Sequence, residues 1–550
     1  MSRTTYDTLG RVKTVTDTND LPVASTTYDP ADSGPLTSTT VEDAKTYKTT
    51  QNLDFATGAA LKVTDPNNRV TESEYDSLGR ITKLWLPNRL TLLDKTPNYV
   101  YTYHVTSTDM SWVSTGTIKH DGSGYNTVYE FYDSLLRSRQ TQAPTPQGGR
   151  LVSRTEYDAR GLAVSQQSDI WDSTALPGST AVEVSGGQAP LQTDTTYDGA
   201  ARPKKAETKI HGVTRWATDT TYTGDTVATT APSGGQATAV TTNALGQTTQ
   251  RREYAGPTPT GTDFTTTDYT YTPAGQQKTV TGPDQTKWSY TYDLFGRQVT
   301  ATDPDKGKAA TEYNDLDQVV STTPNDDASK KLLYEYDRLG RKTGMWQKDK
   351  TDANKLAAWS FDQLAKGQQD TATRYDGGVT GKAYTDKVTK YDPMYHVAEH
   401  QLLLPDSEPL VSGGHVAKTL SFTTGYNLDG SISQYSAPAV GGPALRRRLL
   451  HLQRPRTAGH RQGHYRLPAR RLLLAAGRPA PAHPGHGRDV LGEEGLPQLG
   501  LRGRYPPPHP LLRHRRRARL HAAGAEVHPG RRRERHLHHR RHHPGRHGQA

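Results

Sequence analysis

The chain has 550 residues and no cysteine, which excludes disulfide bonds and thiolate metal sites. Only 32% of the residues are hydrophobic and 29 tyrosines stand against 6 phenylalanines, so a buried face must be amphipathic and rich in hydroxyl groups. The net charge of +11 is uneven: residues 446–550 hold 25 arginines and 5 acidic residues, whereas residues 1–445 hold 43 basic and 52 acidic residues. The charge therefore indicates no specific nucleic-acid partner for the first 445 residues.

The N-terminus, Met1-Ser-Arg-Thr-Thr-Tyr6-Asp7, has neither the basic stretch nor the apolar stretch that is typical of a signal peptide. No later run is apolar over the length that a membrane-spanning helix needs. We therefore expect no signal peptide and no membrane span. Because the first residues already fall inside a repeated pattern, we expect the chain to be a fragment of a longer protein.

A six-residue signature, Tyr-Asp-x-x-Gly-Arg, recurs along the first 445 residues. Complete or degenerate copies begin at Tyr271, Tyr292, Tyr313 and Tyr336, at intervals of 21, 21 and 23 residues. A period of this size indicates a repeat architecture. Four complete copies supply the predicted structural signature residues: Tyr6, Asp7, Gly10, Arg11, Tyr75, Asp76, Gly79, Arg80, Tyr292, Asp293, Gly296, Arg297, Tyr336, Asp337, Gly340 and Arg341. Degenerate copies begin at Tyr28, Tyr132, Tyr157, Tyr197, Tyr375, Tyr391 and Tyr426.

Each repeat predicts a β-hairpin. Trp288, Tyr290 and Tyr292 alternate with polar residues, which is the pattern of a half-buried strand. Asp293 can then hydrogen-bond the backbone two residues on, and Gly296 can adopt positive φ without a steric cost. One hairpin is not stable alone, so neighbouring copies must pair edge to edge. We predict an all-β fold in which the hairpins of residues 1–445 form one continuous, spiralling and open sheet.

Other segments are predicted from composition and alternation. Residues 81–126 lack the signature but keep an alternation at Tyr99, Tyr101 and Tyr103, so they remain strand. Segments rich in Pro, Gly and Ser predict exposed loops at residues 142–149, 174–188 and 229–237. Residues 356–364 fit either a strand or a short helix.

The composition changes abruptly near Leu445: residues 446–550 contain one Thr and no Ser, Lys, Ile or Phe. Such a tail fits a basic nucleic-acid-binding segment or, at residues 536–543, a His-rich metal-binding tract. It also fits translation in the wrong reading frame, which we favour. Residues 450–456 can be encoded so that a shift of one nucleotide gives Tyr-Thr-Tyr-Asn-Gly-Leu-Gly, and residues 531–543 similarly yield a strand-like sequence. We expect this tail to be mostly disordered.

The Tyr-Asp-x-x-Gly-Arg copies over residues 1–445 resemble the Rhs/YD-repeat family, which includes bacterial Rhs and wall-associated polymorphic toxins, insecticidal toxin complex C components and teneurins. The resemblance implies hairpins that spiral into a hollow shell and, in the bacterial toxins, a C-terminal toxin that the shell encloses or carries. It also implies secretion or display at the cell surface. The Asp-Pro-x-Gly-Leu motif that the family links to shell closure and self-cleavage is absent: Asp29-Pro30, Asp65-Pro66, Asp303-Pro304 and Asp392-Pro393 all lack it.

Candidate catalytic and binding residues are few. His396-Val-Ala-Glu399-His400 matches a zinc-peptidase pattern that requires a helix, but it follows a signature Tyr-Asp and is predicted to be a strand, where the two histidines would lie about 13 Å apart. Asp303-Pro-Asp305-Lys-Gly307 has too few ligands for a calcium loop. We therefore predict no enzymatic activity, no metal and no cofactor.

The predicted function is structural: a shell segment of a polymorphic toxin that encloses or displays a toxin for competition between cells. The expected partner is the toxin domain or the remaining shell of the parent protein. The alternative is a surface or cell-wall adhesin whose repeated tyrosine faces bind carbohydrate.

Overall fold

The computed structural model describes residues 2–89, 95–185 and 187–438. All of them belong to one compact unit, Met1–Gln462, which is separate from a second unit, Gly463–Ala550. The predicted disordered, out-of-frame tail at residues 446–550 lies outside the described residues.

The described residues form a sheet of 34 β-strands. The first seventeen are β1 Arg3–Tyr6, β2 Val12–Thr16, β3 Pro22–Asp29, β4 Ser38–Asp43, β5 Lys48–Leu53, β6 Ala60–Thr64, β7 Val70–Tyr75, β8 Ile81–Trp85, β9 Tyr99–His104, β10 Ser111–Ile118, β11 Tyr125–Tyr132, β12 Ser138–Pro144, β13 Arg150–Tyr157, β14 Ala163–Asp172, β15 Leu191–Tyr197, β16 Pro203–Ile210 and β17 Val213–Thr223. The others are β18 Thr226–Thr229, β19 Thr238–Thr242, β20 Thr248–Tyr254, β21 Phe264–Tyr271, β22 Gln277–Thr281, β23 Lys287–Tyr292, β24 Gln298–Asp303, β25 Gly307–Tyr313, β26 Val319–Thr323, β27 Leu332–Tyr336, β28 Lys342–Gln347, β29 Lys355–Phe361, β30 Gln369–Asp376, β31 Lys382–Tyr391, β32 Val397–Leu403, β33 Thr419–Tyr426 and β34 Ile432–Ser436. The helices are single turns: η2 Pro324–Asp326, η3 Ala328–Lys330, η4 Asp352–Asn354 and α1 Pro409–Ser412.

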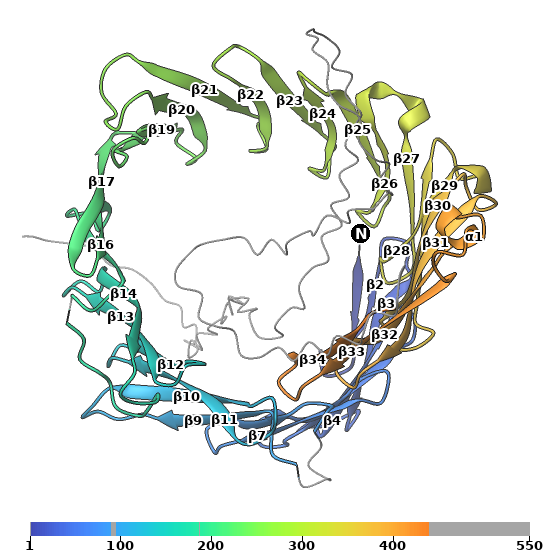
Figure 1. Cartoon of the computed structure of the whole chain (residues 1–550), viewed down its shortest axis with the longest axis horizontal. Helices are drawn as coiled ribbons and strands as arrows, with labels where there is room; N and C mark the ends of the chain where they lie inside the picture. The colour runs from blue at the N-terminus through green and yellow to red at the C-terminus, as the bar shows by residue number, and fades with distance from the viewer. Residues whose placement is uncertain (1, 90–94, 186, 439–550) are drawn as a thin grey trace, which may run out of the picture. The chain divides into compact units, whose positions relative to one another are not determined.

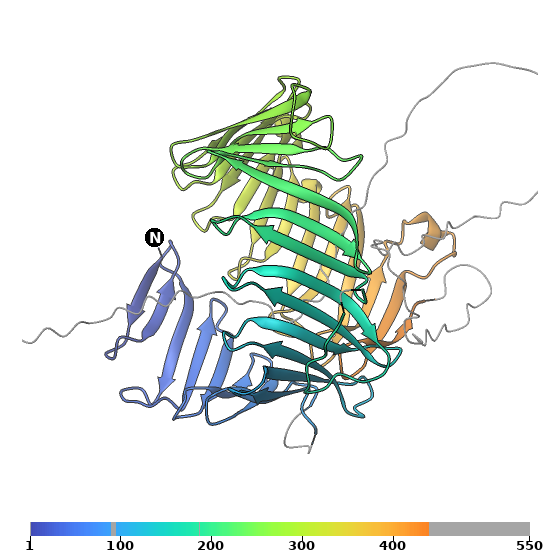
Figure 2. The same cartoon turned by 90° about the vertical axis from the view of Figure 1, so that its left-hand side faces the viewer.

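Each strand pairs antiparallel with the next one along the chain, as β1 with β2, β16 with β17 and β33 with β34. The cyan and green strands of Figure 2 follow one another in this way as one band. The predicted all-β class is confirmed for the described residues, and the ambiguous segment at residues 356–364 is mostly strand β29. Strand β17 links two halves of the sheet, because Val213–Asp219 pair with β16 whereas Thr220–Thr223 pair with β18.

The meander gives the sheet two rims of turns. Every signature turn except the degenerate one after Tyr375 joins an odd-numbered strand to the next even-numbered strand, as residues 7–11 join β1 to β2 and residues 293–297 join β23 to β24. These turns therefore share one rim, here called the signature rim, and the turns from even to odd strands form the opposite rim.

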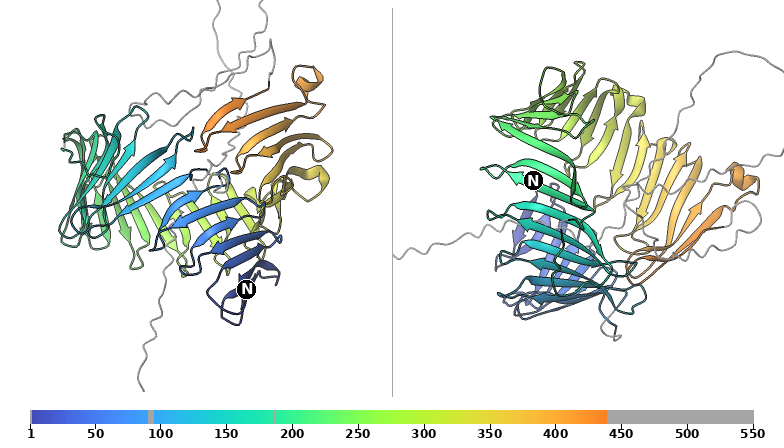
Figure 3. Two further views of the ribbon diagram at one scale, coloured as in Figure 1. Left: turned by 90° about the horizontal axis from the view of Figure 1, so that it is seen from below. Right: turned by 60° about the vertical axis from the view of Figure 1, so that its left-hand side comes forward.

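The sheet bends until its late strands reach its early ones. Strands β28–β34 lie beside β2–β4 in Figure 1, and the left view of Figure 3 shows the same neighbourhood from below. Hydrogen bonds join residues about 300 positions apart, for example Thr18 Oγ1 to the Asp315 carbonyl at 2.9 Å. The described residues therefore form a coil that passes itself once.

Buried apolar residues occur in small clusters rather than in one core. Val152, Ile170 and Ala189 form one, with Val184 packed against it. Val184 lies in the segment between β14 and β15, and buried Gln140 and Gln142 on β12 hold the same segment. The prediction of an exposed loop at residues 174–188 is therefore wrong in part, because this segment covers one face of β12–β14.

Candidate functional site: the signature turns and the seam between coils

The signature residues build a closed hydrogen-bond network within each turn. In the turn between β23 and β24, Asp293 Oδ1 accepts from the backbone N–H groups of Phe295 and Arg297, both at 2.9 Å. Asp293 Oδ2 accepts from Arg297 Nε at 2.7 Å, and the Gly296 N–H donates to the Asp293 carbonyl. Gly296 has φ of +83°, which favours glycine over residues with a Cβ atom. The aspartate thus replaces the backbone partners that the turn lacks.

The other complete copies take the same positions. Asp7, Asp76 and Asp337 each accept from the Nε of the arginine four residues later, and Gly10, Gly79 and Gly340 have positive φ. Hydrogen bonds from the Arg80 backbone N–H, the Arg80 side chain and the Leu78 N–H lower the pKa of Asp76, although partial burial opposes the shift. The turn carboxylates are therefore ionised structural acceptors rather than general acids.

The arginines and tyrosines also connect each hairpin to the next. Arg297 lies 4.8 Å from the ring centroid of Tyr313, and the Tyr313 hydroxyl donates to the Gln298 carbonyl at 3.0 Å. The signature tyrosines Tyr75, Tyr292 and Tyr336 donate equivalent bonds, whereas the ring of Tyr6 on the first strand is 60% exposed. Equivalent stacks of a turn arginine on the next aromatic ring are Arg11–Tyr28, Arg80–Tyr103, Arg137–Tyr157, Arg202–Tyr222 and Arg341–Phe361.

A second site lies where the coil passes itself, and we call it the seam. There the signature rim of β25–β34 contacts the opposite rim of β2–β11. Its side-chain and backbone hydrogen bonds are Thr18–Asp315, Pro22–Arg338, Lys45–Asp362, Asn67–Lys366, Asp65–Tyr395, Asn67–Tyr395, Asn88–Leu428 and His120–Leu428. The seam thus joins unlike rims, head to tail.

A four-residue charge cluster forms the middle of the seam. Lys45 Nζ lies 2.8 Å from Asp362 Oδ2 and 3.2 Å from Asp337 Oδ2. Arg341 donates to the same two carboxylates, from Nη1 to Asp362 Oδ1 at 2.8 Å and from Nη2 to Asp337 Oδ2 at 2.6 Å. The side chains of Asp337 and Asp362 are only 11% and 9% exposed. The two cations therefore neutralise the two largely buried carboxylates, and this pairing offsets the cost of burying the negative charges.

The cluster shifts the titration of its members. Hydrogen bonds from Arg341 and Lys45 lower the pKa of Asp362 well below its ordinary value, although partial burial opposes the shift. Burial opposes the same shift at Asp337, where Arg341 and Lys45 still lower the net pKa. Both acids therefore favour the closed seam in their ionised form.

Tyr395 makes the second major contact of the seam. Its hydroxyl donates to Asp65 Oδ2 and accepts from Asn67 Nδ2 at 2.6 Å, and the Arg69 guanidinium lies 3.5 Å from its ring centroid. Burial and the Asp65 carboxylate raise the pKa of Tyr395 to about 12. Asn67 also holds the Lys366 backbone, accepting from its N–H at 2.7 Å.

The sequence did not identify the seam, although degenerate copies mark it. Tyr395 stands where the signature has glycine, with φ of +64°, and Phe361 replaces the signature tyrosine before Asp362. A residue with a Cβ atom at positive φ is a local cost that the surrounding contacts must offset. These two departures from the signature are the features of the sequence that could have indicated the seam.

The His-x-x-Glu-His pattern lies at the start of strand β32 and not on a helix. His396 Nδ1 contacts Asp392 Oδ2 at 2.8 Å, whereas His400 Nδ1 contacts Asp386 Oδ1 at 2.9 Å. The two histidines thus have separate partners. Within residues 2–89, 95–185 and 187–438, no three His, Asp or Glu side chains are grouped as a metal would require. Nor does that part of the chain contain a helix suited to crossing a bilayer.

Residues 271–308 match the RHS repeat model, so the chain carries an RHS repeat, and the predicted resemblance to the RHS/YD-repeat family is confirmed. The fold is similar to that of part of several larger solved chains. The crystal structure of TcdB2-TccC3 superposes on this chain with a TM-score of 0.60, and the aligned sequences are 14% identical. The match covers 79% of this chain and 25% of that one. The Photorhabdus luminescens Tc holotoxin pore with a mutated TccC3 is 13% identical with a TM-score of 0.61, over 80% of this chain and 27% of that one. This chain thus spans about a quarter of the solved chains it matches. No curated protein sequence matches it.

Proposed function

We propose that the chain is a shell segment of an RHS-repeat toxin, whose role is to enclose or display a polypeptide toxin. The observation that carries this proposal is the seam: a sheet of 34 strands passes itself and is held there by the cluster of Lys45, Asp337, Arg341 and Asp362. A sheet that stacks on itself forms a continuous wall. The likeness to the TcdB2-TccC3 fold supports this role.

The proposed role is structural rather than enzymatic, and its setting is secretion or the cell surface. Its partners are the toxin domain and the remaining shell of a parent protein. The signature tyrosines support packing over carbohydrate binding, because Tyr75, Tyr292 and Tyr336 use their hydroxyls to hold the preceding hairpin.

Limited proteolysis of the protein isolated from its native cells tests the proposal. We expect a second polypeptide, or a segment outside the repeats, to survive protease together with the shell and to be digested once denaturant unfolds the sheet. Digestion of every co-purifying polypeptide before the sheet unfolds would contradict it. Saturable binding to glycans, with no protected polypeptide, would favour the adhesin.

A further inference from the structure

The signature rim of β1–β24 carries a row of exposed apolar side chains on turns that lie outside the seam. Leu78 and Leu245 directly precede the glycines of their turns, and these side chains are 75% and 80% exposed. Other exposed apolar residues on turns of the same rim are Leu9, Phe55, Leu135 and Phe295. The turns recur along one edge of the sheet, so these side chains form a row rather than scattered surface positions.

Where the seam covers the signature rim, leucines in the same turns are less exposed. Leu339 and Leu428 are half-buried. A Cβ atom at Gly122 on the opposite rim would lie 3.1 Å from Leu428 Cδ1, so this leucine packs against the turn that faces it. Even the most exposed leucines of the seam turns, Leu316 and Leu364, are 41% and 50% exposed, below the values of 75% and 80% outside the seam. The seam therefore shows what covers this row: turns of the opposite rim.

The opposite rim has an uncovered turn of the kind that the seam uses. In the seam, Asp65 Oδ1 accepts from the Asn67 N–H at 2.8 Å, and the turn presents the Asn67 side chain to the other coil. In the turn between β24 and β25, Asp303 Oδ1 likewise accepts from the N–H groups of Asp305 and Lys306, at 2.9 and 3.1 Å. Asp305 and Lys306 are exposed. One chain thus presents both partners of the seam contact on uncovered turns.

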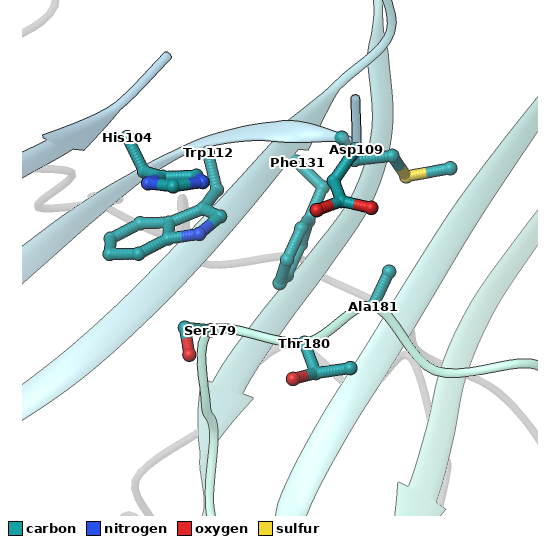
Figure 4. Close-up of a pocket in the computed structure, with 8 residues that line it drawn as sticks. His104, Asp109, Trp112, Phe131, Ser179, Thr180 and Ala181 are labelled. Carbon is teal, nitrogen blue, oxygen red and sulfur yellow. The ribbon is translucent and has the colours of Figure 1, made fainter. Parts of the chain in front are cut away.

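A hollow beside the turn between β9 and β10 adds a polar group to the uncovered signature rim. A cavity of about 370 Å³ is lined there by Asp109, Met110 and residues 179–181, among others. Figure 4 shows the Asp109 carboxylate on the opposite side of the cavity from Ser179 and Thr180, and Asp109 is exposed. In the seam, Lys45 of the opposite rim pairs with carboxylates of signature-rim turns. Asp109 therefore offers an equivalent partner to a lysine of an opposite rim.

We propose that the uncovered signature rim of β1–β24 binds the uncovered opposite rim of a second copy of this chain, so that copies stack head to tail. The occupant is a second copy because the seam already pairs these two rims, and each chain presents both of them uncovered. Since the two surfaces differ, each added copy leaves one free rim at either end, and the stack does not close at two copies. The leucines outside the seam become covered in the stack, as Leu339 is within the seam. This inference rests on the seam and does not depend on whether a toxin is enclosed.

Sedimentation velocity of the full chain tests the stacking. We expect the average mass to rise between about 1 and 100 µM, the range of micromolar affinities, without a plateau at two copies. Sodium chloride at about 0.5 M screens any attraction by the arginine-rich residues 446–550. The double variant Leu78→Asp/Leu245→Asp should need at least about tenfold more protein for the same mass, because charges replace apolar groups in the contact. Trp216→Asp, the same type of change at an exposed residue in the body of β17, should sediment as the wild type does.

Fluorescent labels on single introduced cysteines show which surfaces meet, because the chain has no cysteine of its own. An environment-sensitive dye at Leu245→Cys on the signature rim should shift its emission to shorter wavelength as copies assemble, and so should a dye at Asp305→Cys on the opposite rim. The dye at Trp216→Cys should not shift.

Four outcomes would overturn the proposal. They are a mass that stays at one copy, a plateau at two copies, a dye shift at Leu245→Cys without one at Asp305→Cys, and assembly that Leu78→Asp/Leu245→Asp leaves unchanged. The last outcome would assign the assembly to the open edges of β1 and β34 or to the arginine-rich residues instead of the rims.

Discussion

Asp65 accepts a hydrogen bond from the hydroxyl of Tyr395, although 330 positions separate the two residues. Asp65 lies in a turn between β6 and β7, and Tyr395 occupies the glycine position of a degenerate signature between β31 and β32. Tyr395 thus forms part of its own turn and also contacts a turn between two early strands of the sheet. The signature turn is therefore not only a hairpin connection but also the element with which one coil binds another.

Replacement of Tyr395 by phenylalanine should weaken the seam. The change removes the bonds to Asp65 and Asn67 and leaves the Asp65 carboxylate half-buried, so we expect a loss of about 1–3 kcal/mol. Tyr435→Phe is the control, because that ring on β34 is 38% exposed and its hydroxyl makes no hydrogen bond among the described residues. Hydrogen exchange of the turn between β6 and β7 measures the effect, which would be absent if the seam did not form in solution.

The same tyrosine predicts an alkaline transition. Its pKa in the folded protein is raised to about 12, above the ordinary value of about 10 for an unfolded chain. Its contribution is therefore fully present below pH 10 and is lost as the pH rises through about 12. The difference in unfolding free energy between wild type and Tyr395→Phe should shrink across that window. A constant difference would mean that the Tyr395 hydroxyl does not titrate with the seam.

Lys45 should contribute more than an ordinary surface lysine. Lys45→Met leaves Arg341 as the one cation that contacts both Asp337 and Asp362, and we expect a loss of about 1.5–3 kcal/mol, as for hydrogen bonds to charged groups. Lys418 pairs with Asp406 at the same distance of 2.8 Å but in an exposed loop, so Lys418→Met should cost about 0–1 kcal/mol. Denaturant midpoints of the two variants make the comparison. Equal losses of unfolding free energy in the two variants would mean that Lys45 stabilises the protein no more than an ordinary surface ion pair does.

Acid should open the seam through Asp362 and Asp337. The pKa of each is lowered in the folded protein, so their contribution is present above the unfolded value of about 4 and is lost as the pH falls below it. Unfolding free energies of wild type should fall over that range, and those of Asp362→Asn should fall less. Asp406→Asn, which removes a carboxylate that is 79% exposed, should follow the wild type. If Asp362→Asn also follows the wild type, the acid sensitivity lies elsewhere.

The hairpins were predictable because their chemistry is local. Asp293, Gly296 and Arg297 act on one another within four residues, so the spacing alone determines their roles. The seam was not predictable in the same way. Which turn meets Asp65 depends on twist and curvature summed over more than twenty strands, and a small change in each hairpin would move Tyr395 elsewhere. The packing of residues 174–188 was missed because its partners, Gln140 and Gln142, are buried polar residues whose role depends on a distant segment.

Glycine at the fifth signature position should stabilise the turn because of its backbone conformation, and not because a side chain there would collide with other atoms. Gly79 has φ of +73°, and a Cβ atom added there would meet nothing within 4 Å. Gly79→Ala should therefore cost about 1–2 kcal/mol, the price of the left-handed conformation for a residue with a Cβ atom. Gly199, in the turn between β15 and β16, is the control for Gly79. A Cβ atom at Gly199 would also meet nothing within 4 Å, but the φ of Gly199 is not positive. Gly199→Ala should be neutral or stabilise by about 0.4–1 kcal/mol, since alanine restricts the unfolded chain. Urea unfolding of both variants gives the comparison. Similar free energies for the two would show that the turn between β7 and β8 does not need a left-handed residue.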